Sequence, residues 1–266
     1  MSRLEVTFSA LKSQQKTGLV TYIMAGDGGR DITEHLLQGL PIAGADIIEL
    51  GMPFTDPMAD GPSIQKAANR SLASGTTLEK TLQYAAFARQ HHPNTPIILM
   101  GYYNPIFVMG EDLFIEKAAS AGVDGLIIVD LPPEEDQTLR VHATKHGISM
   151  IRLTTPTTND TRLNDVLEHA GGFIYHVSVK GITGSQSAKD EELAEDLRRI
   201  KARTALPVAI GFGIRTPEQA RSYAQFADAV VVGSALVEKL DVSNPTQEHS
   251  QALLDQVRTL REALDR

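Results

Sequence analysis

Two carboxylate residues in the first quarter of the chain are placed for acid–base chemistry. Glu49 lies within an apolar run, where loss of hydration raises the proton affinity of a carboxylate. If Ile48 and Leu50 pack outward, the alternation of a strand points Glu49 to the opposite face, toward an interior. Asp60 follows eleven residues later, which is enough chain for the loop to fold back over Glu49. Two carboxyl groups in unlike surroundings can divide acid and base roles, and a buried structural ion pair is the alternative for Glu49.

The loop between these residues is stiffened by Pro53, Pro57 and Pro62 and contains a third acid, Asp56. Asp and Pro are common turn formers, and Asp also caps helices. We therefore interpret Asp56 as a turn or cap residue, and the same structural role is the alternative for Asp60.

Glycines cluster in three later segments, each directly after an apolar run. They let backbone N–H groups approach a ligand closely, because no Cβ intervenes. Ser234 would begin a short helix whose free amides and dipole favour an anion. The residues that predict this phosphate site are Gly181, Gly184, Gly211, Gly213, Gly233 and Ser234.

Three tyrosines near the ends of apolar runs predict an aromatic pocket for a substrate: Tyr22, Tyr102 and Tyr175. Packing with the hydroxyl at the rim is the alternative for each of them. Tyr175 and His176 face opposite sides of a strand, so only one of them can point inward. We expect Tyr175 to do so, because it shares a face with Val177.

Two further segments are expected at the same face of the molecule. The loop over 181–192 is interpreted as a mobile lid that closes over a ligand, with a disordered surface connection as the alternative. The segment 103–109 is apolar and interrupted by Pro105. An exposed apolar patch there would indicate a protein partner, and packing beneath the following helix is the alternative.

Other chemistries have less support in the sequence. Lys180 stands where a Schiff-base aldolase would carry its lysine, but it opens a polar loop, whereas such a lysine should be buried. His142 and His146 have the i, i+4 spacing of a metal pair. Because their helix is expected in the outer layer, we predict no metal site. The sequence contains no G-x-S-x-G elbow, P-loop or dinucleotide fingerprint.

Eight short apolar runs must position these residues. Their ends lie about 30 residues apart on average, which suits one strand and one helix per unit. The runs are continuously apolar, as expected for parallel strands that are covered on both faces. The predicted strands are 19–24, 47–50, 97–101, 125–130, 149–153, 172–178, 208–211 and 229–232.

Eight strand–helix units predict an α/β fold, a (β/α)8 TIM barrel over a single domain of residues 1–266. Long stretches after strands 2 and 8 predict extra helices there. A doubly wound open sheet is the alternative, although it usually has fewer strands. In a parallel barrel the loops after the strands converge on one face, which would bring Glu49, Asp60 and the glycines together.

Composition excludes several classes of protein. The formal net charge is −8, whereas proteins that bind nucleic acids or anionic membranes usually carry an excess of basic residues. The chain has no cysteine, so disulfides, thiolate metal sites and a cysteine nucleophile are excluded. Its start lacks the apolar core of a signal peptide, and no apolar run approaches the roughly 18 residues of a membrane helix. We therefore expect a soluble cytoplasmic protein.

The segment from Glu49 to Gln65, ELGMPFTDPMADGPSIQ, resembles the signature of the tryptophan synthase α subunit family. GITG from Gly181, GFGI from Gly211 and GSA from Gly233 match the same family in order and spacing. The resemblance runs the length of the chain. It implies a carbon–carbon lyase that needs no cofactor and cleaves indole-3-glycerol phosphate to indole and glyceraldehyde 3-phosphate by a retro-aldol reaction.

The resemblance also implies roles by motif position. Glu49 corresponds to a general acid/base that protonates indole C3 and takes the side-chain hydroxyl proton. Asp60 corresponds to the carboxylate beside the indole N–H, Tyr175 to a residue beside the substrate, and Thr183 to a lid residue that closes over Asp60. The positions that match phosphate contacts are Gly184, Gly213 and Ser234.

The family works as an α2β2 complex, in which a β subunit with pyridoxal phosphate receives indole through a tunnel. The resemblance therefore implies a β-subunit partner, with interface positions at Asp56, Pro57, Asn104 and Phe107. Tyr22 stands where Phe is frequent in the family. A Schiff-base aldolase and a non-enzymatic barrel that binds phosphosugars are the alternatives to the lyase.

Overall fold

The predicted apolar runs form the strands of one parallel sheet. The structure is a computed structural model, and it describes residues 1–178, 186–211 and 213–266. Every strand pairing that it contains is parallel. The strands are β1 (Gly18–Met24), β2 (Ile47–Gly51), β3 (Ile97–Gly101), β4 (Gly125–Ile128), β5 (Ser149–Met150), β6 (Arg152–Thr154), β7 (Ile174–Val177), β8 (Val208–Gly211) and β9 (Ala229–Val232).

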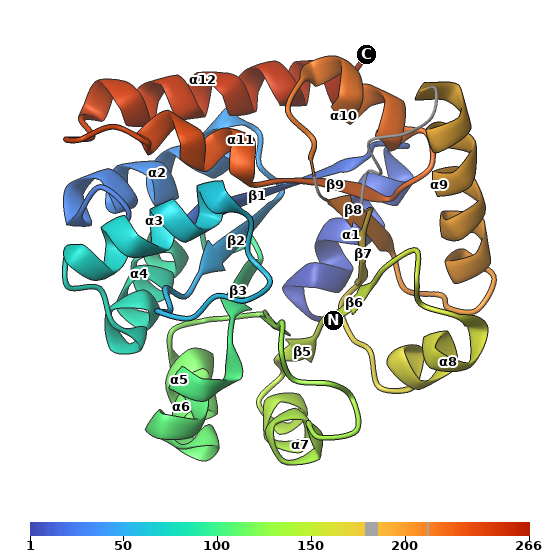
Figure 1. The fold of residues 1–266 in the computed structure, drawn as a ribbon, viewed down its shortest axis with the longest axis horizontal. Helices are drawn as coiled ribbons and strands as arrows, with labels where there is room; N and C mark the ends of the chain where they lie inside the picture. Colours follow the sequence, from blue (N-terminus) through green and yellow to red (C-terminus); the bar gives the residue numbers. More distant parts are fainter. Residues whose placement is uncertain (179–185, 212) are drawn as a thin grey trace.

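The sheet closes into a barrel (Figure 1). Its strand order is β5-β4-β3-β2-β1-β9-β8-β7-β6. The two end members, β5 and β6, are consecutive pieces of the predicted fifth strand, separated by Ile151. The Ile151 N–H donates to the carbonyl of Leu126 on β4 at 2.9 Å, so the backbone passes without a gap from one edge to the other. The predicted (β/α)8 barrel is confirmed.

Helices surround the barrel and follow nearly every strand. Two of them, α3 and α4, follow β2, and α11, η1 and α12 follow β9. The helices are α1 (Arg3–Ser13), α2 (Arg30–Ala43), α3 (Pro62–Ala73), α4 (Leu78–His91), α5 (Tyr103–Met109), α6 (Glu111–Ser120), α7 (Gln137–Lys145), α8 (Asp160–Glu168), α9 (Gln186–Lys201), α10 (Pro217–Ala224), α11 (Ser234–Val237), the 3₁₀ turn η1 (Glu238–Leu240) and α12 (Gln247–Leu264).

Two of the expected loops are partly helical. Residues 103–109, expected as a segment interrupted by proline, form α5, because Pro105 falls in its first turn, where a backbone N–H is not needed for the helix. The predicted lid over 181–192 is wrong in its second half, because α9 already begins at Gln186. Residues 181–185 of that prediction lie outside the described part of the chain.

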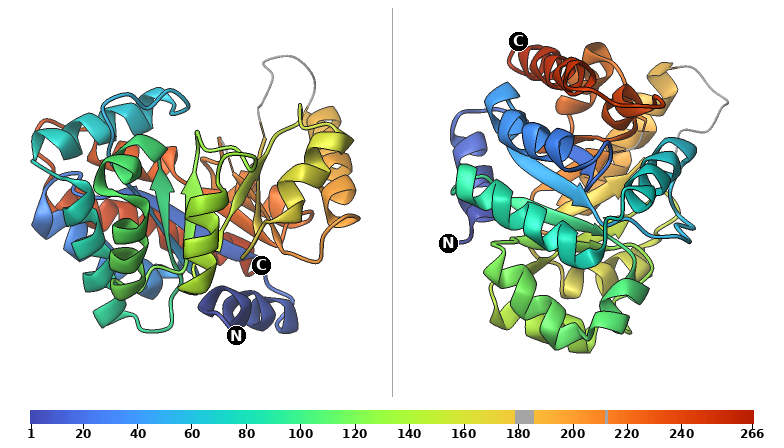
Figure 2. Two further views of the ribbon diagram at one scale, coloured as in Figure 1. Left: turned by 90° about the horizontal axis from the view of Figure 1, so that it is seen from below. Right: turned by 90° about the vertical axis from the view of Figure 1, so that its left-hand side faces the viewer.

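Inward-facing side chains fill the barrel, and α1 covers its lower end. Within α1, Leu4, Phe8 and Leu11 are buried and pack on the barrel interior. The Phe8 ring lies 5.6 Å from that of Phe173, between ring centroids. Figure 2 shows α1 at the end of the barrel opposite the carboxyl ends of the strands. The interior residues are Val20, Ile47, Ile98, Ile127, Ile151, Phe173, Ala209, Ala229 and Val231.

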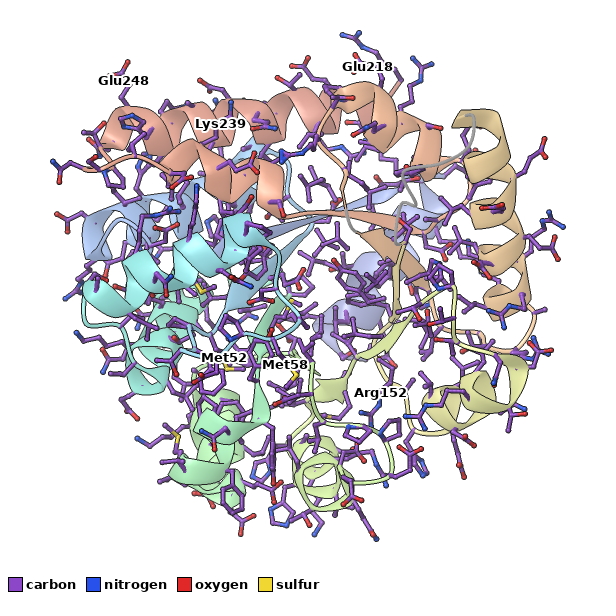
Figure 3. The ribbon with its side chains drawn as sticks, viewed as in Figure 1. Met52, Met58, Arg152, Glu218, Lys239 and Glu248 are labelled. Carbon is purple, nitrogen blue, oxygen red and sulfur yellow. The ribbon has the colours of Figure 1, made fainter. Side chains whose placement is uncertain are left out.

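Charged side chains project from the outer helices (Figure 3), as expected for the solvent side of the helical layer. Figure 3 shows Glu218 and Glu248 projecting from outer helices, whereas Met52 lies inside the ring that they form. Across residues 1–178, 186–211 and 213–266, every helix is too short or too polar to cross a lipid bilayer.

Candidate active site

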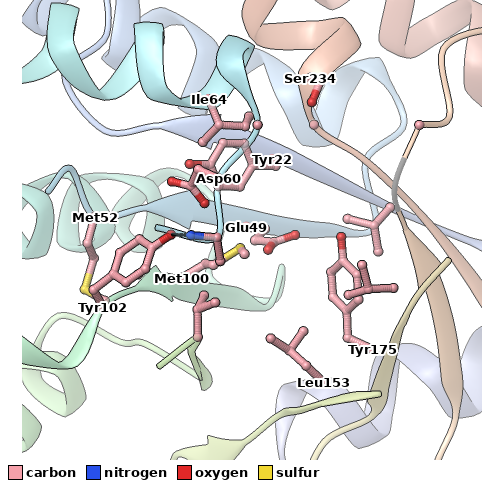
Figure 4. Close-up of a pocket in the computed structure, with 18 of the residues that line it drawn as sticks. Tyr22, Glu49, Met52, Asp60, Ile64, Met100, Tyr102, Leu153, Tyr175 and Ser234 are labelled. Carbon is pink, nitrogen blue, oxygen red and sulfur yellow. Dashed lines mark hydrogen bonds between the residues drawn. The ribbon is translucent and has the colours of Figure 1, made fainter. Parts of the chain in front are cut away.

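A cavity of about 400 Å³ opens at the carboxyl ends of the strands (Figure 4). Side chains from six strands, and residues of the loops that follow these and other strands, surround it, and most of this wall is apolar. Its lining residues are Tyr22, Glu49, Met52, Ala59, Asp60, Gly61, Ile64, Met100, Gly101, Tyr102, Val129, Leu153, Thr155, Tyr175, Val177, Gly213, Ile214, Val231, Gly233 and Ser234.

Glu49 lies at the floor of this cavity. It follows Ile47 on the inward face of β2, while Ile48 and Leu50 pack outward into the helical layer. The side chain is 1% exposed, and neither carboxylate oxygen has a hydrogen-bond partner among the described residues. Burial raises the pKa of Glu49 to about 8, because the charged form loses hydration that nothing replaces. Glu49 is therefore a protonated acid at neutral pH.

Asp60 lies on the cavity wall, at the end of the loop that follows β2. Burial raises the pKa of its carboxyl, and a hydrogen bond with the Tyr102 hydroxyl partly offsets this by lowering the pKa. The same hydroxyl accepts the Ala59 N–H at 3.0 Å. Tyr102 itself is 3% exposed, and its ring lies 5.5 Å from that of Phe54. Tyr102 therefore fixes the loop at the residue directly before Asp60.

Tyr175 and Tyr22 lie on either side of Glu49, on β7 and β1. Figure 4 shows the Glu49 carboxylate pointing toward the Tyr175 hydroxyl. Tyr175 occupies the inward face as predicted, whereas His176 is buried on the outward face, where Nδ1 lies 3.1 Å from Thr154 Oγ1. Burial and the nearby Glu49 carboxylate raise the pKa of Tyr175, so its hydroxyl stays neutral.

Gly211 makes room for one of these hydroxyls. A Cβ at Gly211 would lie 2.2 Å from the Tyr175 hydroxyl oxygen, so the glycine is needed for close approach. Gly211 is not among the residues that line the cavity, and its contact with a ligand stays a prediction.

The predicted phosphate residues that the structure describes lie together at one end of the cavity. Gly213, with φ of +74°, and Gly233 both line it, and Ser234 begins α11 directly after Gly233. The first N–H groups of a helix have no partner within that helix, so this end offers backbone donors. Thr183, Gly184, Gly181 and Lys180 lie outside the described residues.

An ion-pair cluster that our sequence analysis missed joins the loop after β8 to α3 and η1 beside this end. Both terminal nitrogens of Arg215 lie 2.6 Å from the carboxylate oxygens of Glu238. Ser63 Oγ donates to the same carboxylate at 2.6 Å. Arg215 follows the lining residue Ile214, and Ser63 precedes the lining residue Ile64. The cluster therefore connects two segments of the cavity wall through residues next to the lining.

The predicted partner positions lie in the loop between β2 and α3 and on α5, close in the chain to the lining residues Ala59 and Tyr102. Asp56 and Asn104 are exposed, Pro57 is half-buried, and Phe107 is 65% exposed. Two apolar neighbours that the sequence analysis did not single out, Met58 and Val108, are 83% and 77% exposed. We call Met58, Phe107 and Val108 the rim patch.

Apolar residues that line the cavity were also missed, chiefly Met100, Val129 and Leu153. The signal was present in the sequence, because each residue stands two positions after an inward core residue of the same predicted strand: Ile98, Ile127 and Ile151.

The structure also places the histidine pair that we considered as a metal site. His142 Nδ1 contacts Asp112, and His146 Nδ1 lies 2.9 Å from the carbonyl of His142. Within the part of the chain that the structure describes, no three His, Asp or Glu side chains are grouped as metal ligands would be.

Comparison with known proteins identifies close relatives of this fold and sequence. The sequence model of the family described as tryptophan synthase alpha chain matches residues 8–265. A tryptophan synthase alpha chain from Legionella pneumophila is 40% identical with a TM-score of 0.89, over 100% of this chain and 98% of that one. A tryptophan synthase from M. tuberculosis, in an open form with BRD0059 bound, is 31% identical with a TM-score of 0.89, over 99% of each chain. A protein from Aquifex aeolicus is 35% identical with a TM-score of 0.90, over 99% of each chain.

Proposed function

The chain belongs to the tryptophan synthase alpha chain family, and from this premise we propose how its cavity performs the reaction. It is a carbon–carbon lyase that cleaves indole-3-glycerol phosphate to indole and glyceraldehyde 3-phosphate. The reaction requires a proton on the leaving carbon, C3 of the indole ring, and removal of a proton from the adjacent side-chain hydroxyl. We propose that residues 1–266 form one domain that carries the whole site.

Glu49 is the general acid and base of this proposal. The protonated carboxyl delivers its proton to indole C3, and the ring becomes an electron sink. The resulting carboxylate then takes the proton of the side-chain hydroxyl, the carbon–carbon bond breaks, and its electron pair returns to the ring. Indole and an aldehyde leave, and Glu49 is protonated again. The pKa of about 8 supports this cycle, because an acid–base catalyst works best when its pKa is near the working pH.

Asp60 and the tyrosines orient and stabilise the indole ring. We propose that the Asp60 carboxylate accepts the indole N–H and so stabilises the positive charge that develops on the ring after protonation. The apolar walls around Tyr22, Tyr102 and Tyr175 hold the ring in the plane that Glu49 needs.

The phosphate binds at the opposite end of the cavity. We propose that Gly213, Gly233 and Ser234 contact it through backbone N–H groups and the Ser234 hydroxyl, and that Thr183 and Gly184 complete the site. Gly213 has open space where a Cβ would lie. This remote binding energy positions the reacting carbons over Glu49.

A β subunit is the proposed partner, in an α2β2 complex that takes up the indole through a tunnel. The rim patch supports this part of the proposal, because three large apolar side chains that are exposed beside a cavity mark an interaction surface. We also propose that the protein is located in the cytoplasm.

The observation that carries the mechanism is the buried carboxyl of Glu49 at the floor of the cavity, which has no hydrogen-bond partner in the part of the chain that the structure describes. The test compares the rate of indole release by wild type and by Glu49→Gln. The matched control is Glu218→Gln, at an exposed position of α10. We expect Glu49→Gln to lower the rate of indole release by about 10²- to 10⁴-fold, while binding of indole-3-glycerol phosphate persists in calorimetry. Glu218→Gln should match wild type. Turnover at the wild-type rate in Glu49→Gln would refute the assignment.

A further inference from the structure

The hydroxyl of Tyr22 is a polar group in the cavity that the mechanism above does not use. Tyr22 lies on β1 directly opposite Glu49 in the β1–β2 register, and it is 6% exposed. Its hydroxyl donates to Met24 Sδ at 3.9 Å. A thioether sulfur is a weak acceptor, so this contact satisfies the buried hydroxyl only poorly.

The backbone of β2 is shaped to admit this hydroxyl. A Cβ at Gly51 would lie 2.2 Å from the Tyr22 hydroxyl oxygen and 2.7 Å from the ring carbon that bears it. Gly51 is the inward position directly beyond Glu49, so the tyrosine reaches past the acid toward the loop that carries Asp60. A ring without the hydroxyl would need less of this space.

Asp60 is a charged neighbour of Tyr22 in the cavity wall (Figure 4). Figure 4 shows the side chains of Tyr22 and Asp60 next to each other at the cavity wall. Among the charged groups that raise the pKa of Tyr22, Asp60 acts most strongly, ahead of Glu49. At neutral pH Glu49 is protonated and already faces Tyr175, whereas an ionised Asp60 is the stronger acceptor.

We propose that Tyr22 is a positioning residue whose hydroxyl donates a hydrogen bond to the Asp60 carboxylate during cleavage and holds that carboxylate toward the indole N–H. Tyr102 already makes a hydrogen bond with the Asp60 carboxyl and restrains the loop at Ala59, and Tyr22 adds a second donor to the same carboxylate. The inference rests on the proposed role of Asp60.

The experiment measures indole release from indole-3-glycerol phosphate across pH for wild type and Tyr22→Phe, which keeps the ring and loses the hydroxyl. Tyr84→Phe, in the helical layer on α4, is the matched control. Without the donor, the Asp60 carboxylate is less stabilised and its pKa rises, so the acid limb of the kcat/KM profile moves to higher pH. We expect kcat to fall about tenfold, as for one lost hydrogen bond to a charged group, with KM nearly unchanged. Tyr84→Phe should leave both unchanged.

A double-mutant comparison separates this role from simple packing. In an Asp60→Asn background, Tyr22→Phe should cause little further loss, because the acceptor charge is already gone. If the Asp60→Asn variant turns over too slowly to measure, the shift of the acid limb of the kcat/KM profile in Tyr22→Phe alone tests the inference. An acid limb that does not move, or an equal loss in both backgrounds, would overturn the inference. If Glu49→Gln abolishes cleavage while Tyr22→Phe behaves as wild type, the proposed function stands and this inference fails.

Discussion

Burial favours the neutral form of the Glu49 carboxyl in the folded protein. This preference links the stability of the fold to the proposed catalytic role of Glu49. Because no side chain or backbone group of the described residues pairs with the carboxylate, ionisation inside the protein costs the hydration of the charge. The same cost keeps the proton available for indole C3.

Stability should therefore depend on pH through this residue. The pKa of Glu49 is about 8 in the folded protein and 4.5 in an ordinary setting. Its contribution to stability is fully present below pH 4.5 and is lost as pH rises toward 8, by up to about 1.4 kcal/mol per pH unit. We expect Glu49→Gln to become progressively more stable than wild type between pH 5 and 8. Urea unfolding at several pH values tests this, and a difference that does not change with pH would contradict it.

Residue-level prediction from the sequence succeeded where strand alternation decides direction. The inward placement of Glu49 and Tyr175 followed from their neighbours on the same strand. The contact between Tyr102 and Ala59 could not be predicted, because it joins residues 43 positions apart through a loop. No periodicity specifies the path of such a loop.

At the scale of elements, α1 acts as a plug that seals the bottom of the barrel. Leu4, Phe8 and Leu11 recur at helical spacing and are all buried. That pattern, with a capping box between Ser2 and Glu5, was present in the sequence. It could have predicted the helix, but periodicity alone could not show that the helix packs on the barrel end.

Truncating the plug should destabilise the fold without altering the chemistry. We expect Phe8→Ala to cost about 3 kcal/mol of unfolding free energy, as for other large-to-small core changes. Val6→Ala, on the exposed side of the same helix, should change it by less than about 0.5 kcal/mol. Chemical denaturation measures both. Equal effects of the two substitutions would show that α1 is not packed as described.

The cluster of Arg215, Glu238 and Ser63 acts on the loops that frame the cavity. Its members are partly exposed, so Arg215→Met should change stability by no more than about 1 kcal/mol. Because the substitution unties the loop that bears Gly213 from η1, which directly follows the Ser234 helix α11, we expect KM to rise about threefold or more, with kcat nearly constant. The control is Arg258→Met, which breaks an exposed pair on α12. Steady-state kinetics that leave KM unchanged would rule out a role for the cluster in the site.

For the whole molecule, large exposed apolar side chains occur both near the mouth of the barrel and elsewhere on the surface. Met58, Phe107 and Val108 are exposed on loops and a helix beside the cavity, whereas Ile42 is exposed on α2. The closed barrel could be predicted from the spacing of eight apolar runs. The exposure of the rim patch could not, because composition does not distinguish an apolar surface from an apolar core.

Charge on the rim patch should weaken association with the β subunit. We expect Phe107→Glu to raise the Kd of the α–β complex at least tenfold, equivalent to about 1.4 kcal/mol. The control is Ile42→Glu, because the Ile42 side chain is 75% exposed on another part of the surface. This variant should leave Kd unchanged. Titration calorimetry measures both. If the two variants bind equally well, the patch is not the contact surface.

The central claim is that the reaction begins from the protonated form of Glu49. Its most direct test is the pH dependence of kcat/KM for indole release by the isolated chain, which reports the ionisation of the free enzyme. Since the acid form is required and its pKa is about 8, kcat/KM should be level near pH 7 and fall about tenfold per pH unit above pH 8. A profile that stays level or rises from pH 8 to 10 would contradict the account.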